Sequence, residues 1–440
     1  MKKNLLIIAF IIGWSLQGQH TISGTFSPAD EYQWMIAYRL NPGTQVYVAD
    51  TAINDGQFAI NLPQNAIPGT YRLVYAVPQE EYFFDIIYNG QEDIDLAFNM
   101  VDGVSFKTSE ENIIFNSYFK EINQLEQQII DYYTLGSTNE NELAKIGQQL
   151  NEVQNSYEEK SKGYIANQFT LANQPYIPSS SQTIQSYVKG KKENYFKGLD
   201  SSNPILQASG FLTNKLTNYV FTALPLETIT PEESTSIVNS NVDTVNTRLS
   251  GVDTKYKLHL FYSLWSQAVA TGQNQAADYI YSVYLKRLAS TLDNQEIITT
   301  IEVYNRLRLG AVAPDLAWEK EGSIKNLSTL EEAEMYVLIF WSSTCGHCLN
   351  ELPALQKELA KNEKVKVIAI GLEDDKISWK RESSKLNLFD HAIALGKWES
   401  DYAKLYDIHQ TPTYFLLDKD KVIIAKPEDD RAVIEFIGSN

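Results

Sequence analysis

A run of seven apolar and aromatic residues followed by two cysteines is the feature that most constrains the fold. The run MYVLIFW spans residues 335–341, and Cys345 and Cys348 follow it in the segment SSTCGHC. A continuous run of this kind is typical of a strand that is buried on both faces. The next segment, CGHCLNELPALQKELAKN, has a helical pattern. Both cysteines are therefore expected where a buried strand passes into a helix.

The elements around this run predict a compact α/β domain over residues 309–440. A second buried strand, VKVIAIGLE, spans residues 365–373, and helical segments follow both strands. The segment TYFLLDKDKVIIA reads as a hairpin with its turn around residues 418–420, and EDDRAVIEFIG reads as a final helix. Alternating strands and helices that end in an antiparallel pair predict a mixed sheet.

Upstream of this domain, the sequence predicts a β domain and then a helical region. Residues 20–104 hold short runs rich in aromatic and β-branched residues, and Asn54-Asp55-Gly56 predicts a hairpin turn. Over residues 105–308 the apolar residues recur at helical spacing, with Ser109 and Thr230 as expected N-caps. The predicted fold class is multidomain, with an N-terminal antiparallel β domain, an α-helical middle region and a C-terminal α/β domain.

Residues 1–19 have the layout of a secretory signal peptide. A basic start, MKK, precedes the apolar core NLLIIAFIIGWSL, and cleavage is expected near Gly18 or Gln19. The apolar run is shorter than the roughly 20 residues that span a bilayer, so we expect no membrane span after cleavage. A retained membrane anchor is the alternative. The mature chain is then expected in the periplasm or another extracytoplasmic compartment, where disulfides persist.

Cys345 and Cys348 are the only cysteines in the chain, and their spacing favours redox chemistry. A structural disulfide across two residues closes a very small loop and adds little stability. One CxxC also supplies only two of the four ligands of a structural zinc site. At a helix start, by contrast, the helix dipole and free N–H groups stabilise a thiolate. We expect Cys345 to be the exposed nucleophile, Cys348 the buried resolving thiol, and protonated His347 a further stabiliser of the Cys345 thiolate.

The formal net charge of -18 and the pI of about 4.8 argue against binding to nucleic acids or anionic membrane surfaces. The sequence contains no cluster with metal-ligand spacing, no glycine-rich phosphate loop and no nucleophilic-serine elbow. We therefore expect no metal, and no cofactor besides a redox-active disulfide between the two cysteines.

Several motifs resemble a known family. FWSSTCGHC resembles the thioredoxin active-site stretch, and CxxCxxExP, completed by Glu351 and Pro353, resembles the TlpA/ResA-like thiol–disulfide oxidoreductases. AVAPDL at residues 311–316 is similar to the opening of that family's thioredoxin domain, and Thr411-Pro412 matches its cis-proline. The resemblance covers about residues 309–440 and implies a thioredoxin-like fold. It also implies a substrate-binding surface formed by Trp341, Thr344, Gly346, Thr411 and Pro412.

Two positions depart from the family pattern. Thr344 stands where the family usually has tryptophan, which makes the surface beside Cys345 smaller and more polar. Ile339 stands where thioredoxin has a buried aspartate, so the proton acceptor for Cys348 must be water or Glu351. Alternatively, Glu351 is an ordinary first-turn acid that complements the helix dipole. The β-rich segment resembles a domain of unknown function that precedes thioredoxin domains in periplasmic proteins of some Gram-negative bacteria.

These features together predict a periplasmic enzyme that exchanges dithiols and disulfides with protein substrates and with a redox partner protein. The helical region could mediate homodimer formation or position a substrate. Gly346-His347 resembles the dipeptide of protein disulfide isomerase, with a potential of roughly -180 mV, whereas the family resemblance implies a reductant. We expect a reductant or isomerase. The alternatives are a partner-binding module with a passive thioredoxin fold, and a thiol peroxidase, because peroxiredoxins also carry APDL.

Overall fold

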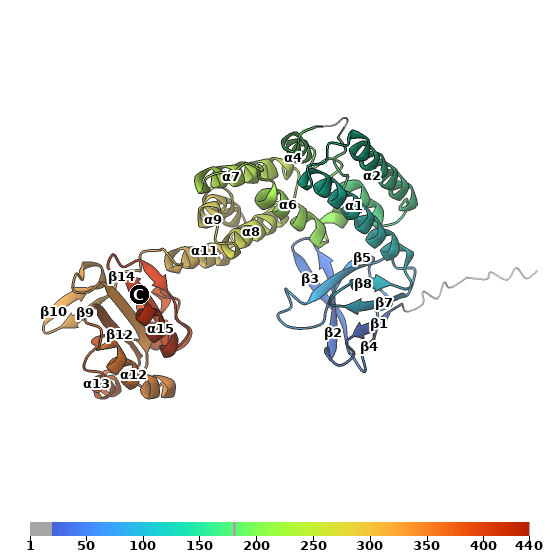
Figure 1. The fold of residues 1–440 in the computed structure, drawn as a ribbon. Coiled ribbons are helices and arrows are strands. Elements are labelled where there is room, and N and C mark those ends of the chain that lie inside the picture. Colours follow the sequence, from blue (N-terminus) through green and yellow to red (C-terminus); the bar gives the residue numbers. More distant parts are fainter. Residues whose placement is uncertain (1–19, 179–181, 440) are drawn as a thin grey trace, which may run out of the picture. The chain divides into compact units, whose positions relative to one another are not determined.

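The computed structural model describes residues 20–178 and 182–439, which divide into two compact units after Leu288 (Figure 1). The predicted signal peptide lies outside the described residues. The division precedes the predicted boundary at residue 308 because α11 (Gln295–Leu307) packs onto the C-terminal core through Val303 and Leu307. Within the described part of the chain, no helix is long and apolar enough to cross a membrane.

Two four-stranded sheets form the N-terminal part of the first unit. One sheet has the order β4-β1-β7-β8 and contains β1 (Thr21–Ser27), β4 (Gln57–Asn61), β7 (Ile94–Asn99) and β8 (Gly103–Phe106). The other has the order β3-β2-β5-β6 and contains β2 (Trp34–Asn41), β3 (Thr44–Ala52), β5 (Gly69–Val74) and β6 (Phe83–Tyr88). Both sheets contribute to one aromatic-rich core. The predicted β domain is confirmed, although one of its pairings, β1 with β7, is parallel.

The predicted turn at Asn54-Asp55-Gly56 connects these two sheets. Asn54 and Gln57 exchange two backbone hydrogen bonds of 2.9 Å, and Asp55 and Gly56 have φ angles of 49° and 72°. Two consecutive residues with positive φ are the signature of a type I′ turn. The strand before the turn, β3, belongs to one sheet, and the strand after it, β4, belongs to the other. The turn therefore joins two layers and does not continue as a paired hairpin.

The helical prediction for the middle region is also confirmed. After α1 (Glu110–Thr134) come α2 (Glu140–Lys160), α3 (Ala166–Ala172), α4 (Ile184–Glu193), α5 (Pro204–Gln207), α6 (Gly210–Thr222), α7 (Pro231–Arg248), α8 (Thr254–Ala270), α9 (Asn274–Ile280), the π-helical turn η1 (Tyr281–Leu285) and α10 (Lys286–Thr291). Ser109 caps α1, and Thr230 caps α7 in a capping box with Glu233. These caps satisfy N–H groups that have no partner inside the helix.

Two buried polar residues at the start of α1 tie the helical region to the β sheets and to α3. The Asn112 side chain accepts a hydrogen bond from Ile87 N at 2.8 Å and donates one to Ile87 O at 2.7 Å. Because Ile87 lies on the edge strand β6, Asn112 occupies the place of a neighbouring strand. The Glu111 carboxylate accepts a hydrogen bond from Ala166 N, and burial raises the pKa of this carboxyl.

The second unit contains a five-stranded mixed sheet of order β13-β12-β11-β14-β15. Its strands are β11 (Met335–Trp341), β12 (Val365–Glu373), β13 (Asp390–Leu395), β14 (Thr413–Asp418) and β15 (Ile423–Ala425). β11 pairs in parallel with β12 and antiparallel with β14. Hydrophobic clusters cover both faces, one built on Tyr336 and Leu338 and the other on Val337 and Ile339. The continuous apolar run is therefore a central strand, as predicted.

Four helices accompany this sheet, and some short elements were missing from the prediction. The helices are α12 (Gly346–Leu359), α13 (Lys376–Ser383), α14 (Asp401–Leu405) and α15 (Asp430–Ser439). The edge strand β13 was not predicted, nor was the hairpin of β9 (Ala317–Lys320) and β10 (Ser323–Asn326). These strands have only four to six residues, which is too short for a clear alternation of polar and apolar residues.

We predict that Asn112→Ala lowers the free energy of unfolding of the first unit by about 2–4 kcal/mol, because it leaves both backbone groups of Ile87 without their partner. Denaturant unfolding of the full chain measures this change. Asn155→Ala is the matched control, since Asn155 is an exposed asparagine on α2 and its replacement should change stability by less than about 0.5 kcal/mol. Equal effects of the two substitutions would show that the Asn112 contacts contribute no stability.

Candidate active site

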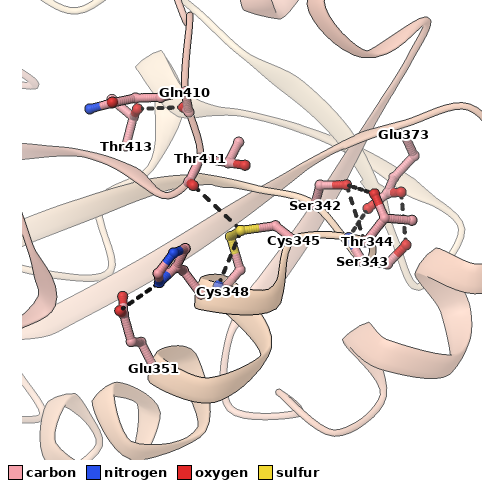
Figure 2. Close-up of a disulfide and its surroundings, with 11 residues drawn as sticks. Ser342, Ser343, Thr344, Cys345, Cys348, Glu351, Glu373, Gln410, Thr411 and Thr413 are labelled. Carbon is pink, nitrogen blue, oxygen red and sulfur yellow. Dashed lines mark hydrogen bonds and ion pairs between the residues drawn. A yellow bond between two sulfur atoms is a disulfide. The ribbon is translucent and has the colours of Figure 1, made fainter.

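The two cysteines lie at the N-terminal end of α12, at the point where the chain leaves β11. Cys345 is the N-cap residue, and its Sγ lies 3.2 Å from Cys348 N. The two residues form a disulfide with a Cα–Cα distance of 5.3 Å (Figure 2). Cys348 is 0% exposed, whereas Cys345 is partly exposed. Only the Cys345 end of the disulfide is therefore open to another molecule.

Thr411 and Pro412 lie beside this disulfide, on the loop that leads into β14. The carbonyl oxygen of Thr411 is 3.4 Å from Cys345 Sγ, although 66 residues separate them in sequence. The peptide bond between Thr411 and Pro412 is cis. Antiparallel pairing of β14 with β11, with Thr413 opposite Phe340, brings this loop to the cysteines. The structure thus places two of the predicted substrate-binding residues next to Cys345.

The other three predicted substrate-binding residues differ in exposure. Thr344 and Gly346 flank Cys345 and are exposed, and Thr344 Oγ1 lies 3.1 Å from Ser342 Oγ. Trp341, by contrast, is 0% exposed and packs in the core cluster that contains Cys348. The prediction that Trp341 contacts a substrate is therefore wrong for this state. Trp341 is the last residue of β11, a strand whose two faces are both covered. Its ring therefore packs in the core against the buried part of the site and does not reach the surface.

His347 and Glu351 are one helical turn apart on α12. His347 Nδ1 lies 3.8 Å from Glu351 Oε1, and the His347 side chain is 85% exposed. Solvent weakens an interaction between such exposed charges. A protonated His347 would be attracted to Glu351 as well as to a thiolate at Cys345. Their roles in thiol chemistry stay predictions.

The charge of Glu351 also acts on Tyr414, a buried tyrosine of the core cluster that contains Cys348. Burial raises the pKa of Tyr414, and the negative charge of Glu351 raises it further. Tyr414 belongs to the same core cluster as Cys348, and its hydroxyl has no hydrogen-bond partner among the described residues. Ile339, in the strand position where thioredoxin has an aspartate, is fully buried in this cluster. Glu351 lies on the same helix as Cys348, and its role in proton transfer stays a prediction.

Glu373 is a residue of the site that the sequence analysis missed. This glutamate ends β12, is 2% exposed, and accepts two hydrogen bonds from Ser343. Ser343 N donates to Oε1, and Ser343 Oγ donates to Oε2 at 2.8 Å (Figure 2). Ser343 lies two residues before Cys345, so the buried carboxylate fixes the loop that carries the exposed cysteine. Hydrogen bonds to a charged group are stronger than those between neutral groups.

A signal for Glu373 was present in the sequence. It is an acid at the end of an otherwise apolar strand segment, VKVIAIGLE. In parallel sheets the carboxyl ends of neighbouring strands meet at one edge, where functional groups gather. Once β11 and β12 are taken as parallel neighbours, Glu373 is expected at the same edge as Cys345.

No group of three or more side chains that could hold a metal ion occurs within residues 20–178 and 182–439. The reactive groups at the site are its two cysteines, its carboxylates and the backbone N–H groups at the start of α12. A disulfide with one accessible sulfur, at the start of a helix, can accept a thiolate from another molecule.

Comparison with known proteins agrees with this geometry. Residues 309–426 match the model of the AhpC/TSA family. This match spans the cysteines, Glu373 and Thr411. The chain belongs to the thioredoxin-fold thiol–disulfide oxidoreductases. No curated protein matches the chain.

Solved structures similar to this thiol–disulfide oxidoreductase come from several bacteria. A domain of a possible thiol-disulfide isomerase from Cytophaga hutchinsonii is 31% identical, with 30% of this chain and 92% of that chain covered and a TM-score of 0.27. A thiol-disulfide oxidoreductase from Bacteroides fragilis is 26% identical, with 29% and 98% covered and a TM-score of 0.27. A thioredoxin-like protein from Bacteroides caccae is 16% identical, with 60% and 97% covered and a TM-score of 0.37.

We predict that Glu373→Gln lowers the free energy of unfolding of the C-terminal unit by about 1–3 kcal/mol, because the amide loses one acceptor and the charge. It should also slow the reaction of Cys345 with a small aromatic disulfide. Ser343→Ala removes only the hydroxyl hydrogen bond and should have a smaller effect on both. Glu363→Gln, at an exposed loop position, is the matched control. An unchanged rate and stability in Glu373→Gln would contradict a positioning role.

Proposed function

We propose that this oxidoreductase acts outside the cytoplasm on protein substrates, as a disulfide reductant or isomerase, through Cys345 and Cys348. The observation that carries the proposal is the unequal exposure of the two cysteines, with Cys348 buried and Cys345 open at the helix start. Such an arrangement lets one thiol meet the substrate while the other stays available for release.

In the proposed reaction, the Cys345 thiolate attacks one sulfur of a substrate disulfide. A new bond forms between Cys345 and that sulfur, the substrate disulfide breaks, and the second substrate sulfur leaves as a thiolate. The Cys348 thiolate then attacks Cys345 Sγ, which releases the substrate dithiol and forms the Cys345–Cys348 disulfide. The substrate gains two electrons and the enzyme loses them. A redox partner protein with a reduced dithiol would return the enzyme to its starting state.

The surroundings of Cys345 support attack by its thiolate. The backbone N–H of Cys348, 3.2 Å from Cys345 Sγ, can donate to a negative sulfur, and the helix dipole adds to this effect. Thr344, Gly346 and the Thr411-Pro412 loop border the exposed sulfur and would contact the substrate backbone. No cofactor besides the disulfide takes part in this scheme.

The extracytoplasmic location rests on the signal-peptide pattern of residues 1–19. A cell exterior or periplasm is also where a substrate protein carries disulfides that need reduction or rearrangement. The match to the AhpC/TSA family favours thiol peroxidase activity as the second candidate, since thiol peroxidases also attack through a thiolate.

We predict that Cys348→Ser accumulates a mixed disulfide with protein substrates, because the sulfur that releases the substrate is missing. Non-reducing gels and mass spectrometry would detect it, and Cys345→Ser, which lacks the nucleophile, should form none. Hydrogen peroxide consumption by the wild type, measured in parallel, tests the second candidate. Rapid peroxide turnover without reduction of protein disulfides would contradict the proposal and favour the peroxidase.

We predict a reduction potential between about -270 and -180 mV for the Cys345–Cys348 pair, the range from thioredoxin to protein disulfide isomerase. Because a protonated His347 would stabilise the reduced thiolate, His347→Ala should lower the potential, by at most about 30 mV given its exposure. His20→Ala, in the other unit, should leave it unchanged. Titration against glutathione gives the values. A potential near -120 mV would assign the protein to the oxidants instead.

A further inference from the structure

A cavity of about 580 Å³ lies within the helical region of the first unit, far in sequence from the cysteines. Its walls come from α1, α4, α6 and the segments that follow α3 and α4. The volume falls in the range of pockets that hold small organic ligands. Asparagines at its rim are exposed, among them Asn123, Asn194 and Asn214, so the cavity is accessible from solvent.

Lys215 of α6 lines this cavity and has no carboxylate partner. Its ammonium group lies 4.7 Å from the centre of the Tyr195 ring and 5.7 Å from that of Phe211. Asn173 Oδ1, at 3.5 Å, is its hydrogen-bond acceptor. Among the ion pairs of the described residues, none involves Lys215. Burial lowers the pKa of this lysine to about 8.

The acidic side chain that lines this cavity is already in an ion pair. Glu126 of α1 forms a 3.0 Å ion pair with Lys191 of α4. With Lys215 protonated, the charged side chains lining the cavity are two lysines and one glutamate, an excess of one positive charge. This excess is notable in a chain with a net charge of -18. Lys215 is only partly exposed, and the charge of Glu126 opposes but does not cancel the effect of burial on its pKa. A desolvated ammonium outside an ion pair is unfavourable, and such groups are more frequent at functional sites than elsewhere.

The side chains that line the cavity indicate which class of ligand it would bind. A single anionic group would pair with Lys215, and a carboxylate has the matching charge of one. The rings of Tyr195 and Phe211 offer apolar surface beside the ammonium, while asparagine amides can hydrogen-bond polar groups of the ligand. We propose that this cavity binds a small aromatic carboxylate, whose carboxylate group pairs with Lys215. This site is separate from the proposed redox function.

The test uses N-acetylphenylalanine as the probe and its uncharged amide as the matched ligand. Isothermal titration to the full mature chain at about pH 6.5, where a lysine with a pKa of about 8 is protonated, should show that the acid binds at least about tenfold more tightly than the amide. Lys215→Met should lower the affinity for the acid by about tenfold or more. Lys189→Met is the control, since Lys189 is an exposed lysine on α4 outside the cavity.

A pH series on the wild type keeps the proposal testable if Lys215→Met does not fold. The other titratable groups lining the cavity are Glu126 of α1, Lys191 of α4, Tyr195 just after α4, and Tyr176 of the segment after α3. Burial raises the pKa of Tyr195 to about 12. Because the ligand pairs with the charged form of Lys215, affinity should fall as the pH rises through about 8. Absence of binding, equal affinity for acid and amide, or pH-independent affinity would each overturn the proposal.

Discussion

The parallel pairing of β11 with β12 is the constraint on which the active site depends. Its register sets Trp341 opposite Gly371, so the loop after β11 and the last residue of β12 meet at one edge of the sheet. Ser343 and Glu373 can therefore form hydrogen bonds across that edge. Antiparallel pairing of β14 on the other side of β11 brings in Thr411. Three segments far apart in sequence thus meet around the loop that carries Cys345.

The sequence was sufficient to predict the local elements of this site. The apolar runs gave the bounds of β11 and β12, and the CxxC spacing placed Cys345 at a helix start and Cys348 one turn inside. Contacts across the sheet were not predictable in the same way, because they depend on strand register. The contact between Glu373 and Ser343 was missed for this reason. Trp341 was misassigned because a strand buried on both faces has no alternation that shows which side chains reach the surface.

In the first unit, too, local elements could be predicted from the sequence, whereas contacts between distant segments could not. Helical spacing and the caps at Ser109 and Thr230 predicted where helices occur. The parallel pairing of β1 with β7 was not visible, since five other strands separate these two neighbours of one sheet in sequence. Nor does the helical periodicity around Lys215 reveal that its ammonium lies near the rings of Tyr195 and Phe211. A buried charge depends on which helices are neighbours, and that follows from tertiary packing alone.

The contact between Asn112 and Ile87 has a consequence for the solubility of the whole protein. An edge strand presents free N–H and C=O groups to which an extended segment of another chain can add, and such addition leads to aggregation. On β6, a side-chain amide from α1 already occupies both groups of Ile87. An incoming strand would have to displace the start of a 25-residue helix before it could pair there. The first turn of α1 thus protects the β6 edge against strand addition by unfolded chains, including unfolded copies of the same protein.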